Sequence, residues 1–151
     1  MELKTKPFGV INIDEKQKIT FTRGIFGFDN IREYALLNAS QWPFFWLQAI
    51  DVPDLAFILI DPLIFRPDYT LDVDESDLLD VDLNPGDRDK MLVFAIVTVP
   101  DDQKKMTANL QGPVIINREK RTGRQFISTN PKWGVRHFIM DELAEKGGSK
   151  C

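Results

Sequence analysis

Side chains suited to metal or nucleophilic chemistry are scarce in this chain of 151 residues, which has one histidine, His137, and one cysteine, Cys151. These two residues cannot supply the ligand set of a structural or a catalytic zinc site. A catalytic triad needs a histidine held between a nucleophile and an acid, and no serine lies in a Gly-x-Ser-x-Gly pattern. Glycine-rich phosphate-binding motifs are also missing. The sequence therefore predicts a protein that is not an enzyme and uses no metal or other cofactor.

Carboxylates are concentrated in one stretch, residues 68–89, which holds nine acidic side chains and a single basic one, Arg88. Within it, residues 72–76 look like the start of an EF-hand calcium loop. The pattern fails at its sixth position, where Asp77 replaces glycine, and at its twelfth, where Leu83 replaces the bidentate glutamate. No spacing singles out a pair of acids for acid–base catalysis. The stretch predicts an acidic surface.

Basic residues are concentrated in residues 118–136, where six lysines and arginines accompany one acid, Glu119. The net charge of −4 argues against nucleic acid as the main ligand, because phosphate neutralisation supplies most of that affinity. An alternative function stays open: a β-barrel that binds single-stranded nucleic acid through this basic stretch, with Phe126 and Trp133 as stacking surfaces. A small-molecule-binding or hydrolytic barrel is a third possibility, and it would need a deep pocket with convergent polar groups.

The composition fits one globular domain, with 43% hydrophobic and 28% charged residues. No linker interrupts it, so we expect a single domain over residues 1–146 and a flexible tail over residues 147–151. A single thiol requires no oxidising compartment, and Cys151 has no evident role. The N-terminus lacks the features of a secretory signal, and the longest apolar runs have the length of strands. We therefore expect a cytoplasmic protein.

Short apolar segments between turn residues predict a mostly β fold. The expected strands are residues 9–13, 18–22, 34–37, 44–50, 55–60, 91–99, 114–117 and 124–128. The first two should form an opening hairpin across residues 14–17, and the last two a second hairpin. Short helical turns are expected at residues 29–33, 75–79 and 141–146. These elements favour a small antiparallel β-barrel-like domain with short helical turns, and a two-sheet sandwich is the rival architecture.

Four ordered blocks of sequence carry a recognisable pattern across most of the chain. They are residues 21–28, with Gly24, Gly27 and Phe28; residues 43–51, with Gln48; residues 55–69, with Asp61 and Pro62; and residues 106–125, with Asn109, Pro113, Asn117 and Gln125. Their order and residue types are similar to the signature of the FliW family of flagellar assembly factors. The glycines and Pro113 are expected to fix turns, and the two asparagines to bond to the backbone beside a strand.

The resemblance implies a small β-barrel-like protein that binds two proteins and has no catalytic role. One partner is CsrA, a basic translational repressor that the family antagonises, and the other is flagellin, which in its free form sequesters the family member. No direct binding of nucleic acid, membrane or small molecule is expected. The acidic stretch would attract a basic partner, so we hypothesise that Asp72, Asp74, Glu75 and Asp77 contribute to the CsrA-facing surface. The alternative is that these charges form a solvated face.

Overall fold

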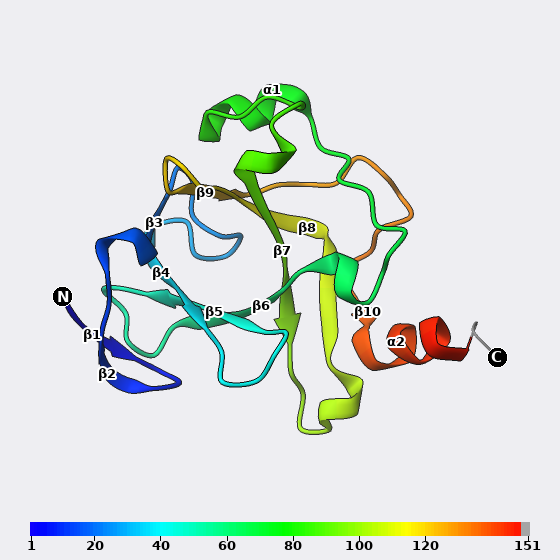
Figure 1. Cartoon of the computed structure of the whole chain (residues 1–151), viewed down its shortest axis with the longest axis horizontal. Coiled ribbons are helices and arrows are strands. Elements are labelled where there is room, and N and C mark those ends of the chain that lie inside the picture. Colours follow the sequence, from blue (N-terminus) through cyan, green and yellow to red (C-terminus); the bar gives the residue numbers. More distant parts are fainter. Residues whose placement is uncertain (149–151) are drawn as a thin grey trace.

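The computed structural model describes residues 1–148, and the side chains of residues 1–144. Seven strands close into a barrel in the order β8-β7-β6-β5-β4-β3-β9, with β9 paired back onto β8 (Figure 1). The strands are β3 (Lys18–Phe21), β4 (Glu33–Asn38), β5 (Phe45–Ala49), β6 (Ala56–Ile60), β7 (Met91–Thr98), β8 (Thr107–Asn117) and β9 (Thr122–Gln125). The mostly β prediction is confirmed, and the architecture is a barrel, not a sandwich.

The barrel is closed by a parallel pair of strands, which the antiparallel prediction did not include. β3 and β9 run in the same direction, with Thr20 opposite Thr122 and Phe21 opposite Gly123. The other neighbouring strands of the barrel are antiparallel. The barrel is therefore closed by pairing an early strand with a late one. Local sequence patterns do not predict pairings between strands so far apart in the chain.

The opening hairpin differs from the predicted one. β2 (Gly9–Asn12) pairs with β1 (Glu2–Thr5), whereas β3 pairs with β4, so the predicted pairing of residues 9–13 with 18–22 is wrong. The residues between β2 and β3 form a 3₁₀ helix, η1 (Glu15–Gln17), in which Asp14 and Gln17 cap each other's backbone. Such a capping box starts a helix, so the chain turns away from β2 instead of folding back on it.

Two further local predictions need correction. The helical turn expected at residues 29–33 is absent: residues 29–32 contain no helix, and Glu33 already belongs to β4. β8 is much longer than the predicted strand at residues 114–117, and its register with β7 shifts between Phe94 and Ile96. Gly112 and Pro113 lie at this irregularity. Neither residue suits a regular central strand, which accounts for the break in register. The second hairpin is confirmed as β8–β9, with β9 ending at Gln125.

The interior of the barrel is filled by alternate residues of its strands. Buried inward-facing side chains include Tyr34, Leu47, Leu59, Phe94 and Ile116. Residues on the other face of the same strands enter three smaller cores on the outside of the barrel. Alternation of this kind is what a two-sided β-barrel wall requires. In each outer core, a part of the chain outside the seven barrel strands packs against the barrel wall.

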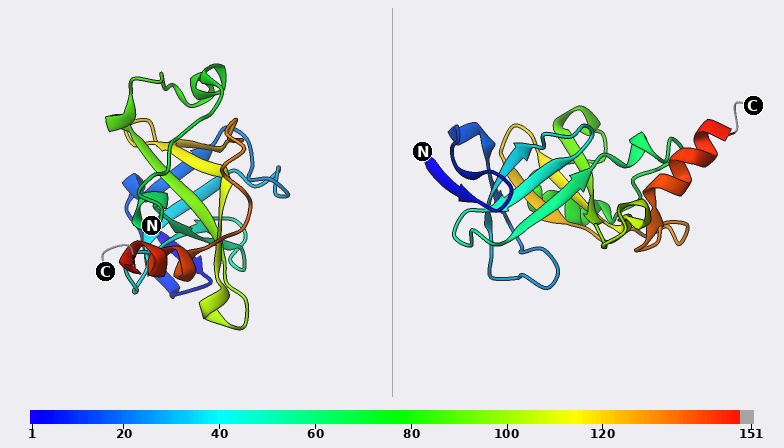
Figure 2. Two further views of the ribbon diagram at one scale, coloured as in Figure 1. Left: turned by 90° about the vertical axis from the view of Figure 1, so that its right-hand side faces the viewer. Right: turned by 90° about the horizontal axis from the view of Figure 1, so that it is seen from below.

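These outer segments lie on different sides of the barrel (Figures 1 and 2). The β1–β2 hairpin packs Leu3 and Ile13 against β4. Residues 70–90 cover β7, β8 and β9 with α1 (Glu75–Leu78), η3 (Leu79–Val81) and η4 (Arg88–Lys90). The remaining elements are η2 (Pro62–Ile64), η5 (Gln103–Lys105), β10 (His137–Phe138) and α2 (Ile139–Gly148). β10 adds to the free edge of β8 and leads into α2.

The C-terminal helix is longer than predicted. α2 includes the expected turn at residues 141–146 and continues through Gly148, so residues 147 and 148 are helical and not part of a flexible tail. The rest of the expected tail, with Cys151, lies outside the described residues. Within residues 1–148, no helix is both long and apolar enough to cross a membrane.

Both tyrosines of the chain, Tyr34 and Tyr69, should titrate abnormally in the folded protein. Burial raises the pKa of each phenol from 10.0 to about 12. Because the folded-state pKa is raised, the neutral phenols stabilise the fold below about pH 10 and this contribution is lost as the pH rises through 12. An absorbance titration should show almost no tyrosinate near pH 10 in native protein, whereas in denaturant about half of the tyrosine should be ionised at that pH. A tyrosinate step near pH 10 with a native circular dichroism spectrum would contradict this placement.

Candidate protein-binding surface

The acidic segment, residues 68–89, is held firmly against the outside of the barrel. Leu78, Val81 and Leu83 are buried against Ile115 of β8 and Phe126, which follows β9. The side-chain amide of Asn117 donates to the backbone oxygen of Val81 at 2.9 Å. The predicted helical turn at residues 75–79 is confirmed as α1 followed by η3. This packing presents the acidic side chains on a fixed frame.

Two of the four predicted partner-binding acids point outward. Asp74 is the N-cap of α1, where its carboxylate accepts hydrogen bonds from the Ser76 hydroxyl at 2.8 Å and the Ser76 amide at 3.0 Å. These bonds, the one from the hydroxyl first, lower the pKa of Asp74. Glu75 lies in the first turn, is exposed, and has no ion-pair partner among the described side chains. Both carboxylates therefore lie at the surface.

The other two predicted acids have partners within the chain. Asp72 accepts hydrogen bonds from Thr70 at 2.6 Å and from Asn130 at 3.0 Å, and these bonds lower its pKa. Asp77 forms an ion pair with Arg124 at 3.6 Å. An outside partner must compete with these contacts, so Asp72 and Asp77 offer less to it than Asp74 and Glu75 do.

Sequence reasoning did not single out two further acids of the segment, Asp82 and Asp89. Both are exposed, and neither carboxylate has a hydrogen-bond or ion-pair partner among the described residues. Asp82 follows η3 and adopts a left-handed conformation. Asp is one of the few residues other than glycine that are enriched in this conformation. Leu79, whose backbone oxygen accepts a hydrogen bond from the Asp82 amide, is 61% exposed. The neighbouring hollow of about 380 Å³ is lined by Leu71, Val73 and Met91 among others.

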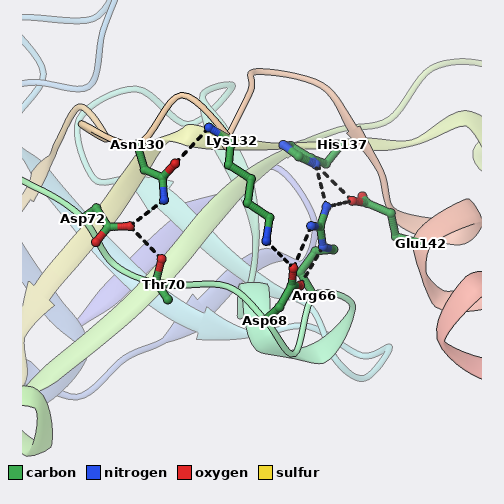
Figure 3. A network of polar contacts seen from close by, with 8 residues as sticks. All are labelled: Arg66, Asp68, Thr70, Asp72, Asn130, Lys132, His137 and Glu142. Carbon is green, nitrogen blue, oxygen red and sulfur yellow. Dashed lines mark hydrogen bonds and ion pairs between the residues drawn. The ribbon is translucent and has the colours of Figure 1, made fainter.

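At the start of the acidic segment, Asp68 belongs to a polar network that ties three parts of the chain together (Figure 3). Its carboxylate accepts two hydrogen bonds from Arg66 and one from Lys132 at 2.7 Å. These bonds, those from Arg66 first, hold the pKa of Asp68 well below its usual range. Arg66 and Lys132 also lie over the ring of Trp133, each at 4.9 Å from its centroid.

The single histidine is part of the same network and has a structural position. The Nε2 atom of His137 accepts a hydrogen bond from the backbone of Gly134 at 2.9 Å, so the ring proton is on Nδ1. Nδ1 lies 3.0 Å from a carboxylate oxygen of Glu142, which also pairs with Arg66. His137 and Glu142 therefore join β10 and α2 to the segment after η2. Neither ring nitrogen is left for a substrate.

The basic stretch does not form the stacking surface that the nucleic-acid alternative needs. Phe126 is fully buried and Trp133 is 1% exposed, so the prediction that they stack on bases is wrong. Arg124 pairs with Asp77 and with Asp80, and Lys132 pairs with Asp68. Two of the six cations of the basic stretch, Arg124 and Lys132, are thus paired with the acidic segment. The two stretches are separate in the sequence, and the fold brings them together.

Buried amides among the motif residues bind loops to the barrel. The side chain of Gln48, fully buried, accepts a hydrogen bond from the Lys6 amide at 2.8 Å and donates to backbone oxygens of residues 49–55. Gln125 accepts from the Phe26 amide at 3.0 Å and donates to the Gly112 oxygen at 2.9 Å. Such bonds satisfy backbone groups where regular pairing ends. These motif positions stabilise the fold.

The remaining motif residues also have local structural roles. Asn109 accepts from the Gly112 amide at 2.9 Å, inside the irregular part of β8 that contains Pro113. Asn117 accepts from the amides of residues 119 and 120 in the β8–β9 turn. Asp61 caps η2, with Pro62 as its first residue. Both asparagines thus bond to the backbone, whereas Pro113, for which a turn was expected, lies within β8.

The first motif block forms a tight loop at the barrel. Gly24 lies so close to residues 28 and 29 that a side chain would collide with their backbone, and Gly27 has a φ of 90°. Phe28 is 38% exposed and packs edge-on against Phe57, with 5.4 Å between ring centroids. Phe26 is 52% exposed. Only these two aromatic residues of the block face solvent to this extent.

In the part of the chain whose side chains are described, no three His, Cys, Asp or Glu residues are grouped as a metal site would require. A model of the FliW protein family matches residues 2–139. The chain belongs to the FliW family. Its similarity to the family therefore extends over all seven barrel strands and every motif block.

Individual FliW proteins are similar to this chain over nearly their full lengths. The flagellar assembly factor FliW of Treponema denticola is 44% identical over 148 residues, which cover 97% of this chain and 99% of that protein. The corresponding factor of Treponema pallidum is also 44% identical, with 97% and 96% covered. A crystal structure of the flagellar assembly factor FliW superposes with a TM-score of 0.84 at 35% identity, covering 92% of this chain and 96% of the other.

Proposed function

We propose that this chain is a cytoplasmic flagellar assembly factor that works by binding proteins. It binds and antagonises the translational repressor CsrA, and free flagellin sequesters it from CsrA. Flagellin synthesis is thereby coupled to flagellum assembly. Membership of the FliW family and the similarity to flagellar assembly factors of two Treponema species support the assembly role. The arrangement of charge on the acidic segment supports a basic partner.

The observation that carries the CsrA part of the proposal is the set of outward carboxylates on a fixed frame. Glu75, Asp82 and Asp89 have no partner among the described side chains, and the nearby Arg124 is already paired with Asp77 and Asp80. An uncompensated acidic surface speeds the encounter with a basic protein. The exposed Leu79 supplies an apolar contact beside these charges.

The same charges explain how binding would inhibit CsrA. An acidic segment held next to the RNA-binding surface of CsrA repels phosphates, so the RNA loses affinity even where its site is not covered. Flagellin reverses the effect by withdrawing this chain from CsrA. No catalytic step is needed at any stage.

The proposal is tested by titrating this protein into a complex of CsrA with flagellin leader RNA and following RNA release. We expect release, reversal on addition of flagellin, and no binding of RNA by this protein alone. Direct RNA binding that weakens steeply with salt, without release from CsrA, would instead support the nucleic-acid alternative.

Neutralising four exposed carboxylates of the acidic segment should weaken CsrA binding about tenfold at low ionic strength, because charge complementarity mainly changes the association rate. The variant combines Asp74→Asn, Glu75→Gln, Asp82→Asn and Asp89→Asn. Asparagine is chosen at Asp74, the helix N-cap, and at Asp82, the left-handed residue, because it is well tolerated in both settings. The matched control, Glu2→Gln, Glu15→Gln, Asp51→Asn and Asp54→Asn, changes net charge equally at exposed sites elsewhere. Titration calorimetry with CsrA measures both. Equal affinities of variant and control would remove the acidic segment from the CsrA surface.

A further inference from the structure

A second hollow lies between the tip of the β7–β8 hairpin and β10, at the end of β7 that is remote from α1 (Figure 1). It has a volume of about 330 Å³ and is lined by Pro100, Lys105, Thr107, Val135, Arg136 and Phe138, among others. The acidic segment ends where β7 begins, at Met91, whereas this groove starts where β7 ends, at Thr98. Eight residues of strand separate them by about 25 Å. Figure 1 shows α1 and the hairpin tip at opposite ends of β7.

The floor of the groove is apolar and exposed. Phe138 is 43% exposed and pairs with Thr107 across the β8–β10 ladder, and Val135 is 54% exposed. Neighbouring apolar side chains at the surface are typical anchors for a protein partner. None of the three outer cores covers them, since Phe138 and Val135 belong to none of these clusters.

The rim of the groove is basic. Lys105 and Arg136 both line it, and within residues 1–144 neither has an ion-pair partner. In contrast, Arg66, Arg124 and Lys132 are all paired with acids. Asp102, on the same turn as Lys105, accepts a hydrogen bond from the backbone of Lys104 at 3.1 Å and does not line the groove. Two uncompensated cations beside an apolar hollow complement a carboxylate beside an apolar side chain.

We propose that this groove docks an acidic polypeptide segment, with an apolar side chain in the hollow and carboxylates at Lys105 and Arg136. A basic protein such as CsrA is repelled here, whereas an acidic segment is repelled by residues 68–89. The inference rests on the proposed function in that it gives flagellin, the second proposed partner, a contact surface separate from that of CsrA. Flagellin would then exclude CsrA by the bulk of the bound protein and not by covering the acidic segment. The chain then has two oppositely charged binding surfaces at the two ends of β7.

The test measures binding of purified flagellin and of CsrA to the full chain and its variants by titration calorimetry. Lys105→Glu combined with Arg136→Glu reverses the rim, and Phe138→Ala removes the floor. The control, Lys4→Glu combined with Lys120→Glu, makes the same change of charge at exposed residues on β1 and on the β8–β9 turn. All four mutated cations are exposed, so thermal unfolding midpoints should stay close to that of the wild type.

We expect each groove variant to bind flagellin at least about tenfold more weakly, with CsrA binding retained and the control unaffected. Wild-type flagellin binding should also weaken with added salt, because the rim charges are exposed. Unchanged flagellin affinity in both groove variants would overturn the inference and leave the proposed function standing. A wild-type chain that binds no flagellin would overturn the inference together with the flagellin part of the proposed function. The wild-type measurement therefore distinguishes failure of the groove from failure of flagellin binding as a whole.

Discussion

Replacing Gly24 by alanine is expected to lower the free energy of unfolding by roughly 3 kcal/mol or more. A Cβ atom at this position would lie 2.3 Å from the Phe28 oxygen and 2.5 Å from the Asp29 Cα. These are backbone atoms of the same loop, so no rotamer change can relieve the collision. The loop holds Ile25 in the barrel core at 2% exposure. Moving it therefore opens the core as well.

Two other glycines provide controls of graded severity for this prediction. Gly27, in the same loop, has a φ of 90° but free space around its Cβ position, so Gly27→Ala should cost about 1–2 kcal/mol. Gly86 has neither a positive φ nor a close neighbour, so Gly86→Ala should be neutral or stabilise by less than about 1 kcal/mol. Urea denaturation of the three variants measures the order. A Gly24 variant no less stable than the Gly27 variant would show that the loop is packed differently.

Gln48→Met should be the second severe change, with a loss of roughly 3 kcal/mol. Methionine has a similar volume but cannot replace the hydrogen bonds of the buried amide. Its loss would leave the Lys6 amide and the carbonyl groups of Ala49, Pro53 and Leu55 without this partner. Each buried polar group left unsatisfied costs about 1–3 kcal/mol, only part of which is recovered by relaxation.

The Gln48 variant can be checked locally as well as globally. The Lys6 amide should exchange its hydrogen faster, because its acceptor is lost, and this reports on the contact between the β1–β2 hairpin and β5. Gln41→Met, at an exposed residue of the β4–β5 loop, is the matched control and should be within about 0.5 kcal/mol of the wild type. Unaltered Lys6 exchange in the Gln48 variant would contradict the role assigned to this amide.

Much of the barrel could be predicted because its strands alternate locally. β4, β5, β6 and β7 follow apolar patterns bounded by turn residues. The antiparallel order of β4, β5 and β6 follows from short connections, whereas residues 61–90 separate β6 from β7. β1 was missed because charged residues flank its single buried leucine, Leu3, in a segment of only four residues. The parallel β3–β9 pair could not be predicted, since no local pattern records a pairing over about a hundred residues.

The candidate surface was predictable in composition but not in arrangement. The excess of acid in residues 68–89 was evident, and Asp74 and Glu75 do face outward. Which acids are already neutralised depends on tertiary contacts such as Arg124 with Asp77. The burial of Phe126 and Trp133 also depends on tertiary contacts. Their basic neighbours in the sequence suggested exposed stacking surfaces, but both rings are buried. Charge patterns predict what a segment contains, and the fold decides which charges stay free.

The parallel pairing that closes the barrel also bears on how the protein is made. β3 ends at residue 21, but its partner β9 begins at Thr122 of a chain of 151 residues. While the ribosome is still adding the residues between them, one edge of β3 has no neighbour, and such an edge can pair with other chains. The nascent protein thus completes its fold only after most of its length has been synthesised, and a chain that ends before Thr122 is left with an open sheet.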